Sequence, residues 1–103
     1  MFFSTHTMVG DADELLERKR RTMDPVVEQL APGFGAILSI TVRTADGIAT
    51  YSLWDSAEGA AAFSQHPDAI EAQRASGLPE PAAFERHDAP QVTFYSLHKA
   101  SDD

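Results

Sequence analysis

The chain has no cysteine among its 103 residues. It can therefore form no disulfide, no thiolate nucleophile and no zinc–thiolate site, and this absence fits a reducing compartment. No stretch of about eighteen apolar residues occurs, so we expect no membrane-spanning helix. Residues 1–10 lack a basic segment followed by a long apolar one, so we expect no secretory signal. The sequence therefore favours a cytoplasmic protein.

Basic charge is also scarce. Eight lysines and arginines stand against sixteen acidic residues, which gives a net charge of −8. Nucleic-acid binding normally needs the opposite sign, so we expect no nucleic-acid partner. The one basic cluster, Arg18-Lys19-Arg20-Arg21, lies in a predicted helix, where Glu14 and Glu17 stand four residues before Arg18 and Arg21. A solvated helix face is the favoured interpretation, and a phosphate site is the alternative.

Signals for a metal ion or a phosphate group are missing. The four histidines, His6, His66, His87 and His98, lack the spacing of metal ligands. The glycines of Gly33-Phe34-Gly35 precede a predicted strand rather than a helix, so they do not suggest a phosphate-binding loop. We therefore predict no metal site and no bound cofactor.

The remaining composition is typical of a globular domain. The chain is 43% apolar and 23% charged, and its length allows one hydrophobic core of modest size. We predict a single domain over residues 1–103, with residues 100–103 as a frayed end.

The clearest pattern in the chain lies between residues 33 and 75. Apolar and polar residues alternate over Phe34–Arg43, which predicts a strand. Asp46-Gly47 predicts a tight turn, because both residues tolerate positive φ. Ile48–Trp54 is rich in β-forming residues and predicts the returning strand of a hairpin.

A helix is expected after this hairpin. Ser56 is a suitable N-cap, and the alanine-rich segment over residues 57–65 is typical of a packed helix. His66-Pro67 breaks this helix, and Pro67 can begin a second short one that Gly77 ends.

The segment before the hairpin predicts a strand and a helix. Phe2–Val9 is rich in β-forming residues, and both of its faces are partly apolar. Asp11 or Asp13 can cap the following helix. Pro25 interrupts that helix, so we expect a kinked or two-piece helix that ends at Ala31-Pro32-Gly33.

The end of the chain predicts a loop and a last strand. Leu78–Pro90 is rich in proline and is expected to form a long loop with Phe84 as its anchor. Gln91–Lys99 is expected to form the last strand.

The predicted order of elements is β-α-β-β-α-β. With right-handed crossovers this order gives an α+β, ferredoxin-like antiparallel sheet with both helices on one face. The second face of such a sheet would meet water, yet no predicted strand has a purely polar side. We therefore predict a homodimer in which two sheets pack face to face.

Several short motifs resemble the antibiotic biosynthesis monooxygenase group of the dimeric α+β barrel superfamily. They are Pro32-Gly33-Phe34, the segment Tyr51-Ser52-Leu53-Trp54-Asp55-Ser56, and Ala62-Phe63 followed by His66-Pro67. The similar layout covers residues 2–99. The resemblance implies a homodimer with a pocket in each subunit between the sheet and its helices.

The resemblance also implies a range of activities. The group includes cofactor-independent oxygenases of polycyclic aromatic molecules, quinol oxygenases and haem-degrading enzymes. In the cofactor-free oxygenases the substrate is the reductant, and the protein supplies a base, an apolar pocket and exclusion of water. Haem degradation is disfavoured here, because Gln73 lies near the position of the iron-ligating histidine, although His66 lies one to two turns earlier.

This chain also contains no asparagine, so any asparagine contact of the related enzymes must be replaced or absent.

Two histidines are the candidate catalytic residues. His6 lies on the first strand, which is central in this fold, and a neutral imidazole there can accept a phenolic proton. The alternative for His6 is a core histidine bonded to a neighbour. His66 is either a pocket residue or a residue that only borders the helix break.

Four residues are candidates for binding a substrate. Trp54, Tyr51 and Phe63 can form aromatic walls of a pocket, although core packing is the alternative for each. Arg43 can neutralise an anionic substrate, although a surface arginine at a sheet edge is the commoner case.

The sequence thus leaves two functions open. The first is a cofactor-independent monooxygenase that oxidises a polycyclic aromatic or quinol-type molecule. The second is a non-catalytic dimer that binds a hydrophobic ligand or a protein partner.

Overall fold

A computed structural model describes residues 1–79 and 83–88 of the chain. The described elements are, in order, β1 (Phe2–Val9), α1 (Ala12–Leu30), the 3₁₀ turn η1 (Ala31–Phe34), β2 (Ala36–Arg43), β3 (Gly47–Trp54), α2 (Ala57–Ser64), α3 (Pro67–Ser76) and β4 (Ala83–Asp88). Within these residues no helix is both long enough and apolar enough to cross a membrane.

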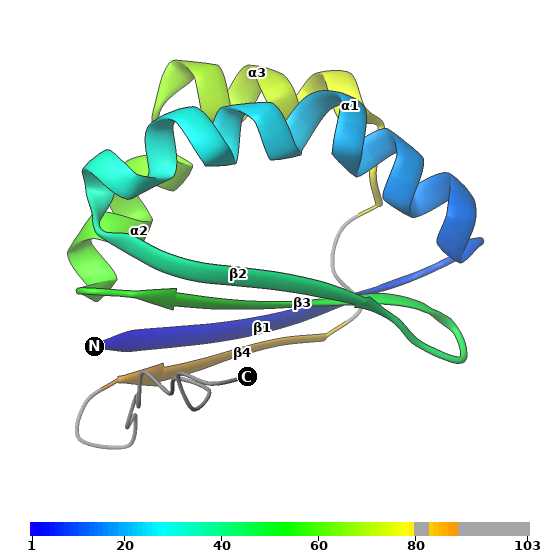
Figure 1. Cartoon of the computed structure of the whole chain (residues 1–103), viewed down its shortest axis with the longest axis horizontal. Helices are drawn as coiled ribbons and strands as arrows, with labels where there is room; N and C mark the ends of the chain where they lie inside the picture. The colour runs from blue at the N-terminus through cyan, green and yellow to red at the C-terminus, as the bar shows by residue number, and fades with distance from the viewer. Residues whose placement is uncertain (80–82, 89–103) are drawn as a thin grey trace, which may run out of the picture.

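The described strands form one antiparallel sheet in the order β2-β3-β1-β4. Figure 1 shows α1, α2 and α3 on one side of this sheet, so that one face is covered by helices. The predicted ferredoxin-like α+β fold is therefore confirmed. β1 and β3 are the two inner strands, and any side chain that they direct toward the helices lies inside the subunit.

Helix α1 begins as its sequence predicts but does not break. The side chain of Asp11 accepts a hydrogen bond from the backbone N–H of Glu14 at 3.1 Å, which caps the first turn. The helix then continues through Pro25 to Leu30, so the two-piece alternative is wrong. Proline removes only one backbone donor, and the packing of Val26, Val27 and Leu30 against the core supports the turn beyond it.

The predicted second strand begins two residues later than expected. Phe34 belongs to the 3₁₀ turn η1, and Gly35 takes a left-handed conformation with φ of 97° before β2 starts at Ala36. A side chain at Gly35 would be strained in this conformation.

The β2–β3 hairpin forms at the expected residues, but not through the turn geometry that the sequence predicts. Neither Asp46 nor Gly47 has positive φ, so the predicted turn geometry is wrong. The backbone N–H of Thr44 donates to the carbonyl of Gly47 at 2.9 Å. Gly47 is needed because a Cβ there would lie 2.0 Å from the carbonyl oxygen of Met8 on β1.

The second helical region divides as predicted. Ser56 caps α2 by accepting a hydrogen bond from the N–H of Gly59 at 3.0 Å. α3 begins at Pro67 and ends at Gly77, which is left-handed with φ of 64°.

The prediction of a long loop over Leu78–Pro90 is wrong for residues 83–88. Ala83–Asp88 forms β4, which pairs with β1 so that Phe84 lies opposite His6 in the register. The edge of β1 offers unpaired backbone groups to any segment that follows α3, and pairing there outweighs the loop-like composition. The predicted strand Gln91–Lys99 and the predicted frayed end lie outside the described residues.

Candidate functional site

The helix-facing side of the sheet carries polar side chains among apolar ones. On the helix-facing side, β1 presents Ser4 and His6 between Phe2 and Met8, which belong to the two core clusters. On β3, Thr50 and Ser52 share this side with Ile48 and Trp54, because residues two apart in a strand point the same way. Polar groups therefore lie inside the subunit.

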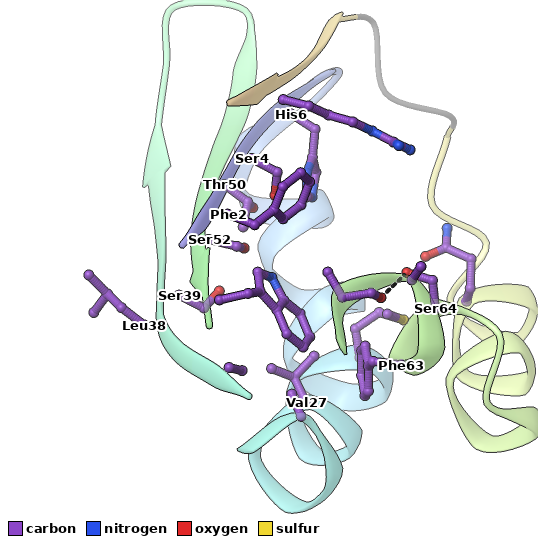
Figure 2. A pocket seen from close by; sticks show the side chains of 18 of the residues that line it. Phe2, Ser4, His6, Val27, Leu38, Ser39, Thr50, Ser52, Phe63 and Ser64 are labelled. Atoms are coloured by element: carbon purple, nitrogen blue, oxygen red, sulfur yellow. Dashed lines mark hydrogen bonds between the residues drawn. The ribbon is translucent and has the colours of Figure 1, made fainter. Parts of the chain in front are cut away.

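A cavity of about 540 Å³ lies between this face and the helices, and Figure 2 shows it from close by. Its lining comes from all four described strands and from α1, α2 and α3. The lining residues on which the argument depends are Phe2, Ser4, His6, Lys19, Val27, Thr50, Ser52, Trp54, Phe63, Gln73 and Arg86. Ligand-binding cavities measure roughly 300–1,000 Å³, so this one is large enough for a small organic molecule.

One end of the cavity is apolar and aromatic. Trp54 lies against Phe63, with ring centroids 5.6 Å apart at an angle of 42°, and both side chains are buried. Phe2 belongs to the same core cluster, and Val27 packs against it from α1. In Figure 2, Phe63 and Val27 mark the end of the cavity opposite His6. Aromatic walls of this kind suit a flat aromatic ligand.

The other end of the cavity carries hydroxyl groups and an imidazole. Ser4 is only 6% exposed and Thr50 only 4% exposed. The hydroxyl of Thr50 lies 3.0 Å from the hydroxyl of Thr41 on β2, and either can donate. Figure 2 shows His6, Ser4 and Thr50 close to one another. This end can form hydrogen bonds to a polar group of a ligand.

The imidazole of His6 is held in its neutral form. Burial lowers the pKa of His6 below its ordinary value of 6.5, and the positive charge of Lys19 lowers it further. A neutral imidazole near pH 7 can accept a proton, which an imidazolium cannot.

Lys19 is the site residue that the sequence prediction missed. It was assigned with its basic neighbours to a solvated helix face, yet its side chain is only 15% exposed and forms an ion pair with Asp24. The helical spacing could have identified Lys19 as a core-facing residue, because it lies three residues after Leu16 and four before Met23, on the stripe that faces the core.

Among the predicted site residues, His6, Trp54 and Phe63 come together at the cavity. His66 is not part of the cavity lining. Its Nδ1 accepts a hydrogen bond from the N–H of Asp68 at 3.1 Å and so caps α3, and its ring lies edge-on to Phe34.

Tyr51 and Arg43 lie away from the cavity. Tyr51 points to the other face of the sheet, where it stacks on Phe3 with ring centroids 6.4 Å apart. Arg43 is exposed at the end of β2 and forms an ion pair with Asp13. His87 is exposed on β4 with its ring 6.1 Å from Phe3, and His98 lies outside the described residues.

Two more polar residues extend the lining. Gln73 reaches the cavity from α3 and Arg86 reaches it from β4. The family resemblance places Gln73 near the position of an iron-ligating histidine, which stays a prediction from the sequence. Within residues 1–79 and 83–88 no three histidine or acidic side chains are grouped closely enough to hold a metal ion.

Comparison with solved structures shows the same fold in several proteins. A protein from Nitrosomonas europaea that carries the name of an antibiotic biosynthesis monooxygenase matches with a TM-score of 0.63 at 13% identity, over 87% of this chain and 99% of that one. SnoaB from Streptomyces nogalater, a cofactor-independent oxygenase, matches with a TM-score of 0.63 at 17% identity, over 88% of this chain and 93% of SnoaB.

A third similar structure is a dimeric ferredoxin-like protein from an uncultured marine organism. It has a TM-score of 0.58 at 11% identity, over 84% of this chain and 82% of that one. No family model matches the chain, and no curated protein matches it. The chain therefore shares the ferredoxin-like α+β fold of antibiotic biosynthesis monooxygenases, at identities that establish the fold alone.

Proposed function

We propose that the protein is a cofactor-independent monooxygenase that oxidises a polycyclic aromatic or quinol-type molecule. The observation that carries this proposal is the cavity, which joins an aromatic end at Trp54 and Phe63 to a half-buried His6 whose pKa is lowered by its surroundings. A closed core filled by the two aromatic residues would have favoured a binding or structural role instead.

His6 is the proposed general base. It takes a proton from a phenol or from an acidic C–H of the substrate, and the resulting carbanion or phenolate is rich in electrons. Ser4 and Thr50 supply hydrogen bonds at the same end of the cavity. Trp54, Phe63 and Phe2 hold the aromatic body and keep water away from the anion.

The substrate supplies all the electrons in this reaction. The anion gives one electron to molecular oxygen, the resulting radical and superoxide combine to a peroxide, and loss of water leaves a carbonyl. In sum, a methylene group and one molecule of oxygen give a carbonyl group and one molecule of water. One oxygen atom enters the product and the other leaves as water, so no external reductant is required.

We further propose that the active form is a homodimer. The sheet face away from the helices carries exposed apolar side chains, and a second copy of the chain would cover them. The exposed side chains on this face are Val9, Leu38, Ile40, Val42 and Tyr51. The dimeric ferredoxin-like protein of the same fold supports this arrangement.

Oxygen uptake tests the enzymatic proposal. We would offer the protein 1,8-dihydroxyanthrone and 1,4-dihydroxynaphthalene and subtract the rate without protein. Replacing a general base commonly costs about 10²–10⁴ in rate, so His6→Gln should lose that much activity while it keeps its fold by circular dichroism. His66→Ala, tested beside it, separates the two candidate histidines. Full activity of His6→Gln would remove His6 from the mechanism.

A non-catalytic binding protein is the second candidate. It is favoured by the aromatic end of the cavity, where Trp54 and Phe63 can hold an aromatic ligand without any reaction. It predicts saturable binding of an aromatic ligand with no oxygen uptake and no product.

A further inference from the structure

We propose that the cavity selects aromatic molecules that carry a negative charge, and that Lys19 is the residue that recognises this charge. The proposal deepens the proposed function by naming the class of ligand. It concerns binding alone, so it can fail or hold independently of turnover.

The first observation is the charge of the cavity. The chain has twice as many acidic as basic residues, yet the described part of the lining contains Lys19 and Arg86 and no aspartate or glutamate. Among the described lining residues the cationic side chains stand without a carboxylate, which favours an anionic ligand, and the apolar walls strengthen the electrostatic interaction by excluding water. The chain as a whole is acidic, whereas the described lining of this cavity is basic.

The second observation is the placement of Lys19. Of the four consecutive basic residues on α1, Arg20 and Arg21 are 66% and 64% exposed, whereas Lys19 is 15% exposed. Burying a lysine is costly unless its charge is paired. Lys19 is paired, through Asp24, and the same side chain lines the main cavity.

The third observation shows where the ligand's charge would lie. A smaller cavity of about 260 Å³ adjoins the main one between α1 and β2, and Lys19, Val27 and Ser39 line both. Asp24 and Glu28 line only the smaller cavity. Lys19 thus stands at the boundary, with Asp24 and Glu28 on its outer side and, on its inner side, the main cavity, whose described lining contains no carboxylate.

These contacts give Lys19 two functions. Asp24 pairs with the ammonium and holds it in place while the cavity is empty. A carboxylate or phenolate on a bound aromatic molecule then shares or takes over the ammonium, while the aromatic body lies against Trp54 and Phe63. The positive charge of Lys19 also acts on His6, whose pKa it lowers, so the cation and the base face the same ligand.

A matched pair of ligands tests the proposal. 2-Naphthoate and 2-naphthamide have nearly the same shape, but only the first carries a charge. Isothermal titration calorimetry on the full chain should show about tenfold tighter binding of 2-naphthoate, since a hydrogen bond to a charged group is worth about that factor. Equal binding of the two ligands would overturn the proposal.

Substitutions locate the recognition at Lys19. Lys19→Met should remove the preference for 2-naphthoate over 2-naphthamide, and Lys19→Arg should restore part of this preference. Arg20→Met removes the same charge from an exposed position on the same helix and should keep the full preference. A preference that survives Lys19→Met, or that Arg20→Met reduces equally, would contradict the assignment.

Asp24→Asn provides an independent check that keeps Lys19 in place. Asp24 competes with the ligand for the ammonium, so its loss should tighten 2-naphthoate binding several-fold. Unchanged or weaker binding of 2-naphthoate in Asp24→Asn would also contradict the proposal.

Discussion

The helix-covered (inner) face and the open (outer) face of the sheet differ in the side chains that they bury and expose. On the helix-covered face, Ser4 and Thr50 are 6% and 4% exposed, whereas on the open face Ile40 and Val42 are 45% and 41% exposed. Proteins normally bury apolar groups and expose polar ones. The buried hydroxyls of the inner face suit the ligand that we propose there, and the exposed apolar side chains of the outer face suit the proposed contact with a second copy of the chain.

Among the substitutions on the inner face, loss of an aromatic side chain that lines the cavity should lower the free energy of unfolding most. Trp54 packs against Phe63 and belongs to the larger core cluster. Trp54→Ala should lower the free energy of unfolding by about 3–5 kcal/mol, measured by urea denaturation. It should also weaken binding of 2-naphthamide. A loss below about 1 kcal/mol would show that the aromatic end is not part of a packed core.

A charge placed on the outer face should weaken the proposed dimer without unfolding the subunit. Ile40→Glu places a carboxylate on the apolar surface that we assign to the dimer. Isolating a charge in an interface costs several kcal/mol, so the dissociation constant should rise at least about a hundredfold. Sedimentation equilibrium measures it. Glu58→Gln on α2, away from this face, serves as the control, and a dimer that withstands Ile40→Glu would place the interface elsewhere.

The paired hydroxyls of Thr41 and Thr50 permit a more specific test of the inner face, with a smaller expected effect. Thr50→Val leaves the hydroxyl of Thr41 without its 3.0 Å partner and should lower the free energy of unfolding by about 1–3 kcal/mol. Adding Thr41→Val should recover most of the loss, because neither polar group then remains. A double variant as unstable as the sum of the two single variants would show that the pair does not interact.

The smallest expected effect is a pH dependence from His6. Its pKa is lower in the folded chain than its ordinary 6.5, so the unfolded chain binds more protons between the two values. Stability should therefore be complete above about pH 6.5 and should fall as the pH drops toward the folded pKa. Comparing His6→Gln with the parent chain by urea denaturation isolates this contribution. A pH profile unchanged by the substitution would mean that His6 titrates normally.

Sequence alone predicted the fold because each element has local signals. Asp11, Ser56 and Gly77 mark helix ends by backbone chemistry. Prediction was poorer where contacts with residues far away in the sequence determine the local structure. Ala83–Asp88 becomes a strand because β1 offers an edge, and Gly47 is required by the carbonyl of Met8 rather than by the turn itself.

The candidate site was predicted only in part, for a similar reason. His6 was predicted because the first strand is central in this fold, and Trp54 and Phe63 were predicted as aromatic walls; all three line the cavity. Tyr51 lies on the opposite face because it is one residue out of phase with Thr50, and strand periodicity alone does not show which face the helices cover. Lys19 was missed because its charged neighbours concealed its position on the core-facing stripe.

Isotope labelling tests the central claim, that the inner face is an oxygenase site with His6 as its base. The protein would turn over 1,8-dihydroxyanthrone under ¹⁸O-labelled molecular oxygen, with the product analysed by mass spectrometry. We predict one ¹⁸O atom in the product, formed about 10²–10⁴ times more slowly by His6→Gln. Product without ¹⁸O, or equal rates for the parent chain and His6→Gln, would contradict the claim.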